Sequence, residues 1–272
     1  MHDILVHLDP RLNPDPASDY ALGLAQRFSA NATATSALAS EMPVGYMLES
    51  GGALLDQVQA DARAAMRQGV DRFVADARDF GVIAETAPLE GATLELHRSV
   101  AQLARHFDLS VVGQPPSGDA RMSLVEALLF ESGRPVVIVP AIFRGAVKLD
   151  TILVAWDGGK EATRAIAGAM PILRAARAVQ LITIVEPHKR GAVDLPGFNI
   201  TRHLARKGVH AELKRITSDL DAGNTLLSHA ADVGADMIVM GAYGHSRWRE
   251  LLLGGATRQL LHSMTTPTLL SH

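Results

Sequence analysis

Glycines near the C-terminal end of the chain have the spacing of a loop that can hold a phosphate. Gly241 and Gly244 follow a short apolar run, nine residues then intervene, and Gly254-Gly255-Ala256-Thr257 opens a segment with helical periodicity. Glycine lets a backbone turn tightly and approach a ligand closely. The free N–H groups and the positive dipole end of a helix suit a phosphate or another anion. The spacing therefore predicts an anion site that is built mainly from backbone.

Arginines near the glycines bear on the same prediction. Arg247, Arg249 and Arg258 could add charge-assisted hydrogen bonds to a bound anion. A simpler interpretation is that Gly241 and Gly244 only form a turn after a strand, and that the arginines belong to a solvated face. The glycine pattern taken alone favours this simpler interpretation.

An aspartate, Asp157, ends the apolar run of residues 152–156. In open parallel sheets, ligands bind beyond the carboxyl ends of the strands, where the strand order reverses. The residues that follow the first and fourth strands of such a sheet are therefore candidates for binding, and Asp157 and Gly241 hold these positions. An aspartate after a strand is also a common turn former, so both interpretations of Asp157 stay open.

Composition excludes several other kinds of chemistry. The 272 residues include no cysteine, which rules out disulfides, thiolate zinc sites and cysteine nucleophiles. The 11 histidines show no paired metal-ligand spacing, and no Gly-x-Ser-x-Gly elbow occurs, so no metal ligand and no catalytic residue is assigned. A net charge of -3 gives no broad basic field, and we expect no nucleic-acid partner.

Apolar runs alternate with helix-period segments along the whole chain, which is typical of repeated βα units. Near-continuous apolar strands such as 237–240 need helices on both faces, and a doubly wound parallel sheet provides them. The sequence therefore predicts an α/β fold with two Rossmann-like, five-stranded parallel sheets. The predicted strands are 4–8, 33–39, 82–88, 109–113 and 135–139, then 151–156, 179–185, 210–216, 236–241 and 267–271; the predicted helices include 16–29, 54–80, 93–106, 122–132 and a short one at 196–207.

The two halves of the chain follow one plan. Residues 4–9 resemble 152–157, residues 108–113 resemble 236–241, and residues 135–139 resemble 267–271. Three correspondences in the same order indicate an internal duplication. We expect a first copy at 1–142 and a second at 149–272, with a linker around 143–149.

Neither a leader nor a membrane span is expected. The first strand-like run begins almost at Met1 and contains His7, so no signal peptide is visible. No run of about 18 apolar residues without charge occurs. We expect a protein of the cytoplasm with no membrane partner.

The glycine loop resembles the G-x2-G-x9-G-(S/T) loop of universal stress protein domains, and the resemblance covers the whole chain as a tandem pair. It implies an adenine-nucleotide site in the second copy, with ATP as ligand, with or without magnesium. Asp157 would contact adenosine, and the backbone of Val185 would pair with adenine. The resemblance assigns ribose and phosphates to Met240, Gly241, Gly244, Gly254, Gly255, Ala256 and Thr257.

Both copies depart from the family pattern. Gly255 stands where the pattern has Ser or Thr, so one phosphate-binding hydroxyl is missing, and Thr257 could replace it only in part. A lost hydrogen bond to a charged partner costs about 1 to 3 kcal/mol. In the first copy Gly113 is followed by Gln114-Pro115-Pro116, and prolines lack the N–H groups of a phosphate cradle. The sequence therefore favours a first copy without nucleotide, although Asp9 is present.

The last strand of each copy leaves an apolar edge that needs a partner. Similar domains pair through this strand, so we expect residues 136–139 and 268–271 to meet within one chain as an internal pseudo-dimer. A further dimer between two chains is compatible with this expectation.

Three functional hypotheses follow. The first is a stress-response regulator that binds ATP in the second copy as a sensor. The second is a nucleotide-independent scaffold or carrier of a small ligand or lipid, which Gly255 and the Pro115-Pro116 loop favour. The third is an enzyme that hydrolyses ATP slowly, although no general base is identifiable.

Overall fold

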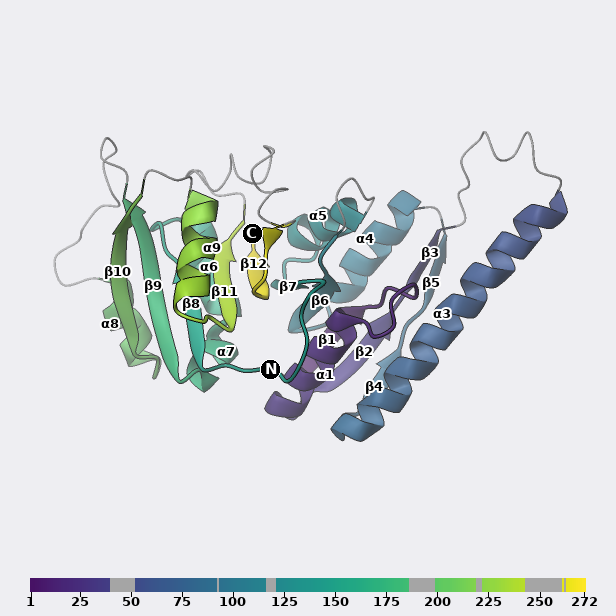
Figure 1. Ribbon diagram of the computed structural model, residues 1–272, viewed down its shortest axis with the longest axis horizontal. Helices are drawn as coiled ribbons and strands as arrows, with labels where there is room; N and C mark the ends of the chain where they lie inside the picture. Colours follow the sequence, from purple (N-terminus) through teal and green to yellow (C-terminus); the bar gives the residue numbers. More distant parts are fainter. Residues whose placement is uncertain are drawn as a thin grey trace. The chain divides into compact units, whose positions relative to one another are not determined.

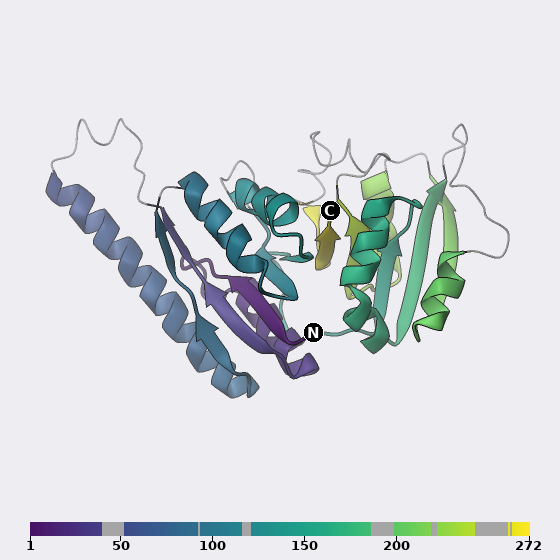
Figure 2. The same ribbon diagram turned by 180° about the vertical axis from the view of Figure 1, so that it is seen from behind.

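The computed structural model of the chain describes residues 1–39, 52–91, 93–115, 121–185, 199–218, 222–242, 261 and 263–272 (Figures 1 and 2). The residues form two compact units. Unit 1 comprises Met1–Gly113 with Ala120–Arg134, and unit 2 comprises Gln114–Asp119 with Pro135–His272.

Unit 1 is a parallel sheet in the order β4-β2-β1-β6, with a small parallel pair, β3-β5, beside it. Helix α1 packs against α3, and α4 packs against α5. The elements of this unit are β1 (Asp3–His7), α1 (Pro16–Phe28), β2 (Asn31–Thr35), β3 (Ala37–Ala39), α3 (Gly52–Phe80), β4 (Ala84–Thr86), β5 (Leu89–Gly91), α4 (Thr93–Ala104), β6 (Leu109–Gly113) and α5 (Arg121–Glu131).

Unit 2 has the strand order β10-β9-β8-β11-β12-β7, in which β7 alone is antiparallel to its neighbour. Its elements are β7 (Val136–Val139), β8 (Thr151–Ala155), α6 (Lys160–Gly168), α7 (Met170–Ala175), β9 (Ala178–Val185), α8 (Ile200–Arg206), β10 (Ala211–Thr217), α9 (Ala222–Asp232), β11 (Met237–Gly241) and β12 (Thr268–Ser271). The α/β class and the parallel sheets expected from the sequence are confirmed.

The central strands form where β-branched and other apolar residues run without interruption. Every residue of β7, β11 and β12 is buried, because these strands are covered on both faces. Helix α1 begins where Asp15 caps it and Pro16 supplies a favourable first position, and it ends at Ser29, which is left-handed with φ 49°. The caps explain why the predicted boundaries of this helix agree closely with the structure.

Two predicted strands are interrupted in the structure. Residues 33–39 contain the end of β2 and all of β3, whereas of residues 82–88 only Ala84–Thr86 form a strand, β4, and a separate strand, β5, begins at Leu89. Pro88 lacks the N–H that a continuous ladder would use. Pairing resumes beyond it, where the Leu89 N–H donates to the Ser36 carbonyl oxygen at 3.0 Å.

The expected pairing of the two last strands is present within unit 2. Strand β12 pairs antiparallel with β7, with Thr268 opposite Ile138 and Leu270 opposite Val136. Strand β7 therefore belongs to the second compact unit, although it directly follows the elements of the first unit along the chain. The pairing buries two apolar strands that would otherwise expose an edge.

An aspartate clamps the start of the first strand in both units. The Asp108 carboxylate, just before β6, accepts the His2 N–H at 2.6 Å and the Asp3 N–H at 3.4 Å. In unit 2, Asp236, just before β11, accepts the N–H groups of residues 150 and 151 at 2.8 and 2.9 Å. Burial alone would raise the pKa of Asp108, but the N–H donors lower that pKa overall. The clamp fixes β1 to β6, and β8 to β11, at the amino ends of the strands.

None of the helices in the described part of the chain combines the length and the apolarity that crossing a bilayer requires.

We expect Asp236→Ala to lower the free energy of unfolding by about 1 kcal/mol, because two strand N–H groups lose a charged acceptor near the surface. Asp108→Ala should act in the same way. Because its folded pKa is lowered, the contribution of Asp108 is present above the ordinary pKa and disappears as the pH falls through the folded value. Urea unfolding at pH 7 measures both effects. The exposed Asp232→Ala is the matched control, and equal effects of Asp236→Ala and Asp232→Ala would contradict the clamp.

Candidate functional site

The strand order of unit 2 reverses between β8 and β11. The chain runs from β8 outward through β9 to β10, then crosses back to β11 on the other side of β8. Side chains and N–H groups beyond the carboxyl ends of these two strands therefore face the crevice where ligands bind in such sheets.

Asp157 lies two residues beyond β8, in the short turn that leads into α6. Its Oδ1 accepts the N–H of Gly159 at 2.8 Å, and Gly158 has φ +79°. A Cβ on Gly159 would lie 2.9 Å from the same Oδ1. The carboxylate thus forms the turn, which is the simpler of the two roles considered for it, and it still sits at the switch point.

Gly241, the last residue of β11, touches the first turn of α6. A Cβ at this position would lie 2.5 Å from the Ala162 amide nitrogen and 2.5 Å from the carbonyl carbon of Glu161. Backbone atoms cannot yield to such a contact as a flexible side chain can, so only glycine fits here. The Asp157 turn, the start of α6 and the end of β11 are thereby brought together.

The first turn of α6 combines features that favour and disfavour an anion. The N-cap residue, Gly159, makes no side-chain capping hydrogen bond. Close by, Glu161 is only 4% exposed, and the Lys160 Nζ lies 3.4 Å from its Oε1. Unpaired N–H groups at a helix start attract anions, whereas the buried carboxylate would repel them. Glu161 was not among the candidates that the sequence indicated.

Val185 and Met240 occupy the same edge of the sheet. Val185 is the last residue of β9 and pairs with Thr217 of β10. It lies three residues beyond Ile182, the residue of β9 that pairs with the end of β8 at Ala155. Met240 pairs with Leu270 and is 2% exposed, so its side chain belongs to the core. Only the backbone of Met240 is available to a ligand.

The remaining predicted residues lie outside the described part of the chain. These are Gly244, Gly254, Gly255, Ala256 and Thr257, together with Arg247, Arg249 and Arg258. The structure brings together Asp157, Gly241 and the edge at Val185, but it does not bear on the glycine loop. Within the described residues, no group of three or more His, Asp or Glu side chains is placed to hold a metal ion.

The corresponding region of unit 1 is built more loosely. A Cβ on Gly113, the counterpart of Gly241, would lie 4.0 Å from the Ala17 Cβ, which is an ordinary contact. The turn after β1 spans residues 8–15, whereas the turn after β8 spans only 156–159. Unit 1 therefore has a longer turn and a wider spacing at the same topological position.

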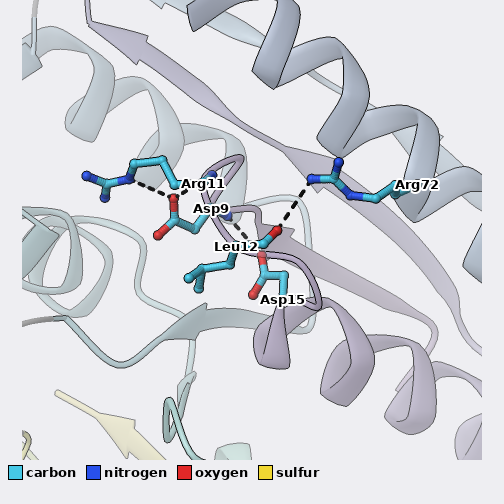
Figure 3. A network of polar contacts seen from close by, with 5 residues as sticks. All are labelled: Asp9, Arg11, Leu12, Asp15 and Arg72. Carbon is cyan, nitrogen blue, oxygen red and sulfur yellow. Dashed lines mark hydrogen bonds and ion pairs between the residues drawn. The ribbon is translucent and has the colours of Figure 1, made fainter.

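A polar network organises the longer turn (Figure 3). The Asp9 Oδ1 accepts the Arg11 Nε–H at 3.1 Å, and the Asp9 N–H donates to the Asp15 Oδ2 at 2.9 Å. The Asp15 Oδ1 accepts the Ala17 N–H at 3.0 Å and so caps α1. Burial raises the pKa of Asp15, and the charge of Asp9 adds to the rise, while the N–H donors oppose it.

We expect Gly241→Ala to lower the free energy of unfolding by about 2 kcal/mol or more, because the new methyl group collides with the backbone of α6. Gly113→Ala is the matched control, with room for its methyl group, and should change stability by less than about 1 kcal/mol. Thermal and urea unfolding measure both. Equal losses of stability in the two variants would show that α6 does not pack closely against the end of β11.

A second prediction concerns Asp15 and pH. Because its folded pKa is raised, the folded state holds a proton that the unfolded state has released, so stability falls as the pH rises from the ordinary value of 3.8 to the folded pKa. Asp15→Asn removes the charge and keeps one oxygen that can cap the Ala17 N–H, but the Asp9 N–H, which donates to the second carboxylate oxygen, loses its acceptor. We expect a flatter stability profile in acid than that of the wild type.

Asp15→Ala removes the cap as well and should cost about 1 kcal/mol relative to Asp15→Asn. Urea unfolding between pH 3 and 7 distinguishes the variants. Parallel profiles for the wild type and Asp15→Asn would contradict a raised pKa.

Comparisons with solved structures agree with this fold. A universal stress protein from Archaeoglobus fulgidus is similar over 99% of this chain and 95% of its own, with a TM-score of 0.68 and 16% identity. A protein of unknown function from Pseudomonas aeruginosa PAO1 covers 99% of the chain and 92% of its own, with a TM-score of 0.58 and 15% identity. At these identities the likeness shows the fold alone.

Two sequence comparisons give more specific matches. A universal stress protein from Synechocystis is 24% identical over 148 residues, which are 53% of this chain and 49% of that protein. The chain thus spans about half the length of this relative. The sequence model of the universal stress protein family matches residues 148–272. Residues 148–272 therefore form a domain of the universal stress protein family.

Proposed function

We propose that the C-terminal copy, residues 149–272, binds ATP and serves as a nucleotide sensor in a stress response. The observation that carries the proposal is the backbone contact between Gly241 and the start of α6, 2.5 Å from a virtual Cβ to the Ala162 nitrogen, at the switch point of the sheet. This contact brings the end of β11 beside the first turn of α6, which follows directly on the turn at Asp157. The edge of the sheet at a switch point is where α/β sheets bind nucleotides, which supports the proposal.

In the proposed complex each predicted residue has a role. Asp157 contacts the adenosine portion, and the backbone of Val185 pairs with adenine. The ribose and phosphates contact the Met240-Gly241 backbone, Gly244 and the segment Gly254-Gly255-Ala256-Thr257, with or without magnesium. The chain supplies binding and orientation, and we expect a sensor that releases ATP unchanged.

The proposal also treats the first copy, residues 1–142, as a second universal stress protein-like domain. The repeated aspartate clamps at Asp108 and Asp236 support this view, as does the pairing of β7 with β12. The loose contact at Gly113 supports a first copy that binds no nucleotide. We place the protein in the cytoplasm, where ATP is available.

Glu161 favours a competing function, a nucleotide-independent scaffold or carrier of a small ligand or lipid. Its carboxylate, 4% exposed in the first turn of α6, would repel a phosphate at that helix start. Lys160, with Nζ 3.4 Å from the Glu161 Oε1, offsets part of this charge. The balance between the two residues decides whether an anion is accepted.

The test is calorimetric titration of the protein with ATP, with and without magnesium. We expect micromolar binding, weakened roughly ten- to hundredfold by Asp157→Asn because a hydrogen bond to adenosine loses its charged acceptor. Gly244→Val should abolish binding by blocking the close approach of the loop. Asp150→Asn is the matched control, since it makes the same charge change at the opposite end of β8.

Three outcomes would contradict the proposal. Absence of binding in the wild type favours the scaffold or carrier function. Equal affinities of Asp157→Asn and Asp150→Asn show that the nucleotide lies elsewhere. Steady production of ADP that Asp157→Ala abolishes indicates an enzyme.

A further inference from the structure

A cavity of about 270 Å³ lies in unit 1, between the turn after β1 and the C-terminal half of α3. It occupies a different copy and a different pair of elements from the proposed nucleotide site. Its ionisable lining is mostly acidic: Asp9, Asp15, Asp19, Asp76 and Asp79 with Arg72. The volume corresponds to roughly nine water molecules, so a small metabolite would fill it.

Both walls of the cavity are longer than the corresponding described elements of unit 2. The turn after β1 spans residues 8–15, while the corresponding turn in unit 2 spans 156–159. Helix α3 has 29 residues, while α8, which follows the second strand of unit 2, has 7. The cavity thus lies between two elements of unit 1 that are longer than their described counterparts in unit 2.

Polar contacts hold the walls in place (Figure 3). The Arg72 Nη2 donates to the Leu12 carbonyl oxygen at 3.4 Å and so ties α3 to the turn. Arg11, whose Nε lies 3.1 Å from the Asp9 Oδ1, is 66% exposed and is not part of the lining. Five carboxyl groups therefore face one guanidinium group in the lining, and two of the carboxyl groups, Asp9 and Asp15, are joined through the Asp9 N–H.

This lining selects the charge of a ligand. A concave site with low-dielectric walls and an excess of one charge concentrates ions of the opposite sign. A cation in the cavity would also relieve the repulsion between Asp9 and Asp15, which contributes to the raised pKa of Asp15. The cavity is therefore suited to a positively charged ligand.

The apolar part of the lining selects an organic cation over a metal ion. Leu8, Leu12, Phe73 and Phe80 lie among the carboxyl groups, and Phe73 is 1% exposed. Within the described residues, no three carboxyl or imidazole groups converge as metal ligands. Carboxyl groups distributed along apolar walls match a chain of methylene groups that carries separated ammonium groups.

We propose that this cavity binds a linear aliphatic amine with two or more ammonium groups. The ammonium groups pair with Asp76 and Asp79 on α3 and with Asp9, Asp15 and Asp19 on the turn and α1, while the methylene chain lies against Leu12 and the two phenylalanines. The first copy then carries a ligand site of its own, whether or not the second copy binds ATP.

The test is calorimetric titration of the full chain with 1,4-diaminobutane and with spermidine. 1,4-Butanediol serves as the neutral analogue. We expect saturable binding of one amine per chain, weakened about tenfold by Asp76→Asn through loss of one charge-assisted contact. Asp71→Asn is the matched control, because Asp71 is exposed on the same helix and is outside the lining. Asp71→Asn should leave the affinity for the amine unchanged. Neither variant should change the affinity for ATP.

Several outcomes would overturn the proposal. Absence of saturable amine binding would do so, as would equal weakening by Asp76→Asn and Asp71→Asn, which would indicate only a diffuse attraction to an acidic surface. Binding of 1,4-butanediol as tightly as the diamine would refute charge selection, and displacement of the diamine by equimolar magnesium would refute an organic ligand. If Asp76→Asn does not fold, as judged from its melting curve, the exposed Asp79→Asn replaces it with the same expected weakening.

Discussion

The contact between the end of β11 and the first turn of α6 determines how closely this helix approaches the sheet of unit 2. Gly241 leaves no room for a side chain, since a Cβ would lie 2.5 Å from backbone atoms of Glu161 and Ala162. The position of α6 therefore depends on the short turn at Asp157 that precedes it. The hydrogen bond from the Gly159 N–H to the Asp157 carboxylate holds this turn. The arrangement of β11, the start of α6 and the Asp157 turn is thus set by backbone packing.

The two units share their amino-end construction and differ at their carboxyl ends. Asp108 and Asp236 hold the first strand in the same way, with a carboxylate that accepts two successive N–H groups. At the opposite edge, the spacing at Gly113 is wide where that at Gly241 is tight. Because the amino ends fix the first strand in both units, the carboxyl ends can differ without loss of the fold.

Most of the fold could be predicted because the strands are short, apolar and buried on both faces. Strands β6, β7, β11 and β12 begin or end within one residue of the expected positions, since turn residues such as Asp236 and Pro267 bound them. The break between β2 and β3 and the separate strand β5 were not predicted, because they depend on Pro88 and on pairing between distant segments. Strand β7 groups with unit 2 because it pairs with β12. This pairing was expected, since it buries two apolar edges.

The candidate sites were less accessible to sequence reasoning. Asp157 and Gly241 could be predicted to meet, because the topology of parallel sheets places them together. The tight fit at Gly241 and the buried Glu161 could not, since both depend on how closely α6 approaches β11. The acidic cavity leaves no local pattern at all: Asp15 and Asp76 are separated by some 60 residues and meet only because α3 packs beside α1.

Hydrogen–deuterium exchange of the full chain, with and without ATP and magnesium, tests the division of function between the copies most directly. The account predicts slower amide exchange in residues 157–163 and 237–242 when ATP is present, with unchanged exchange in residues 8–19 and 109–113. Protection of residues 8–19 and 109–113 by ATP, or no protection of either copy, would contradict it.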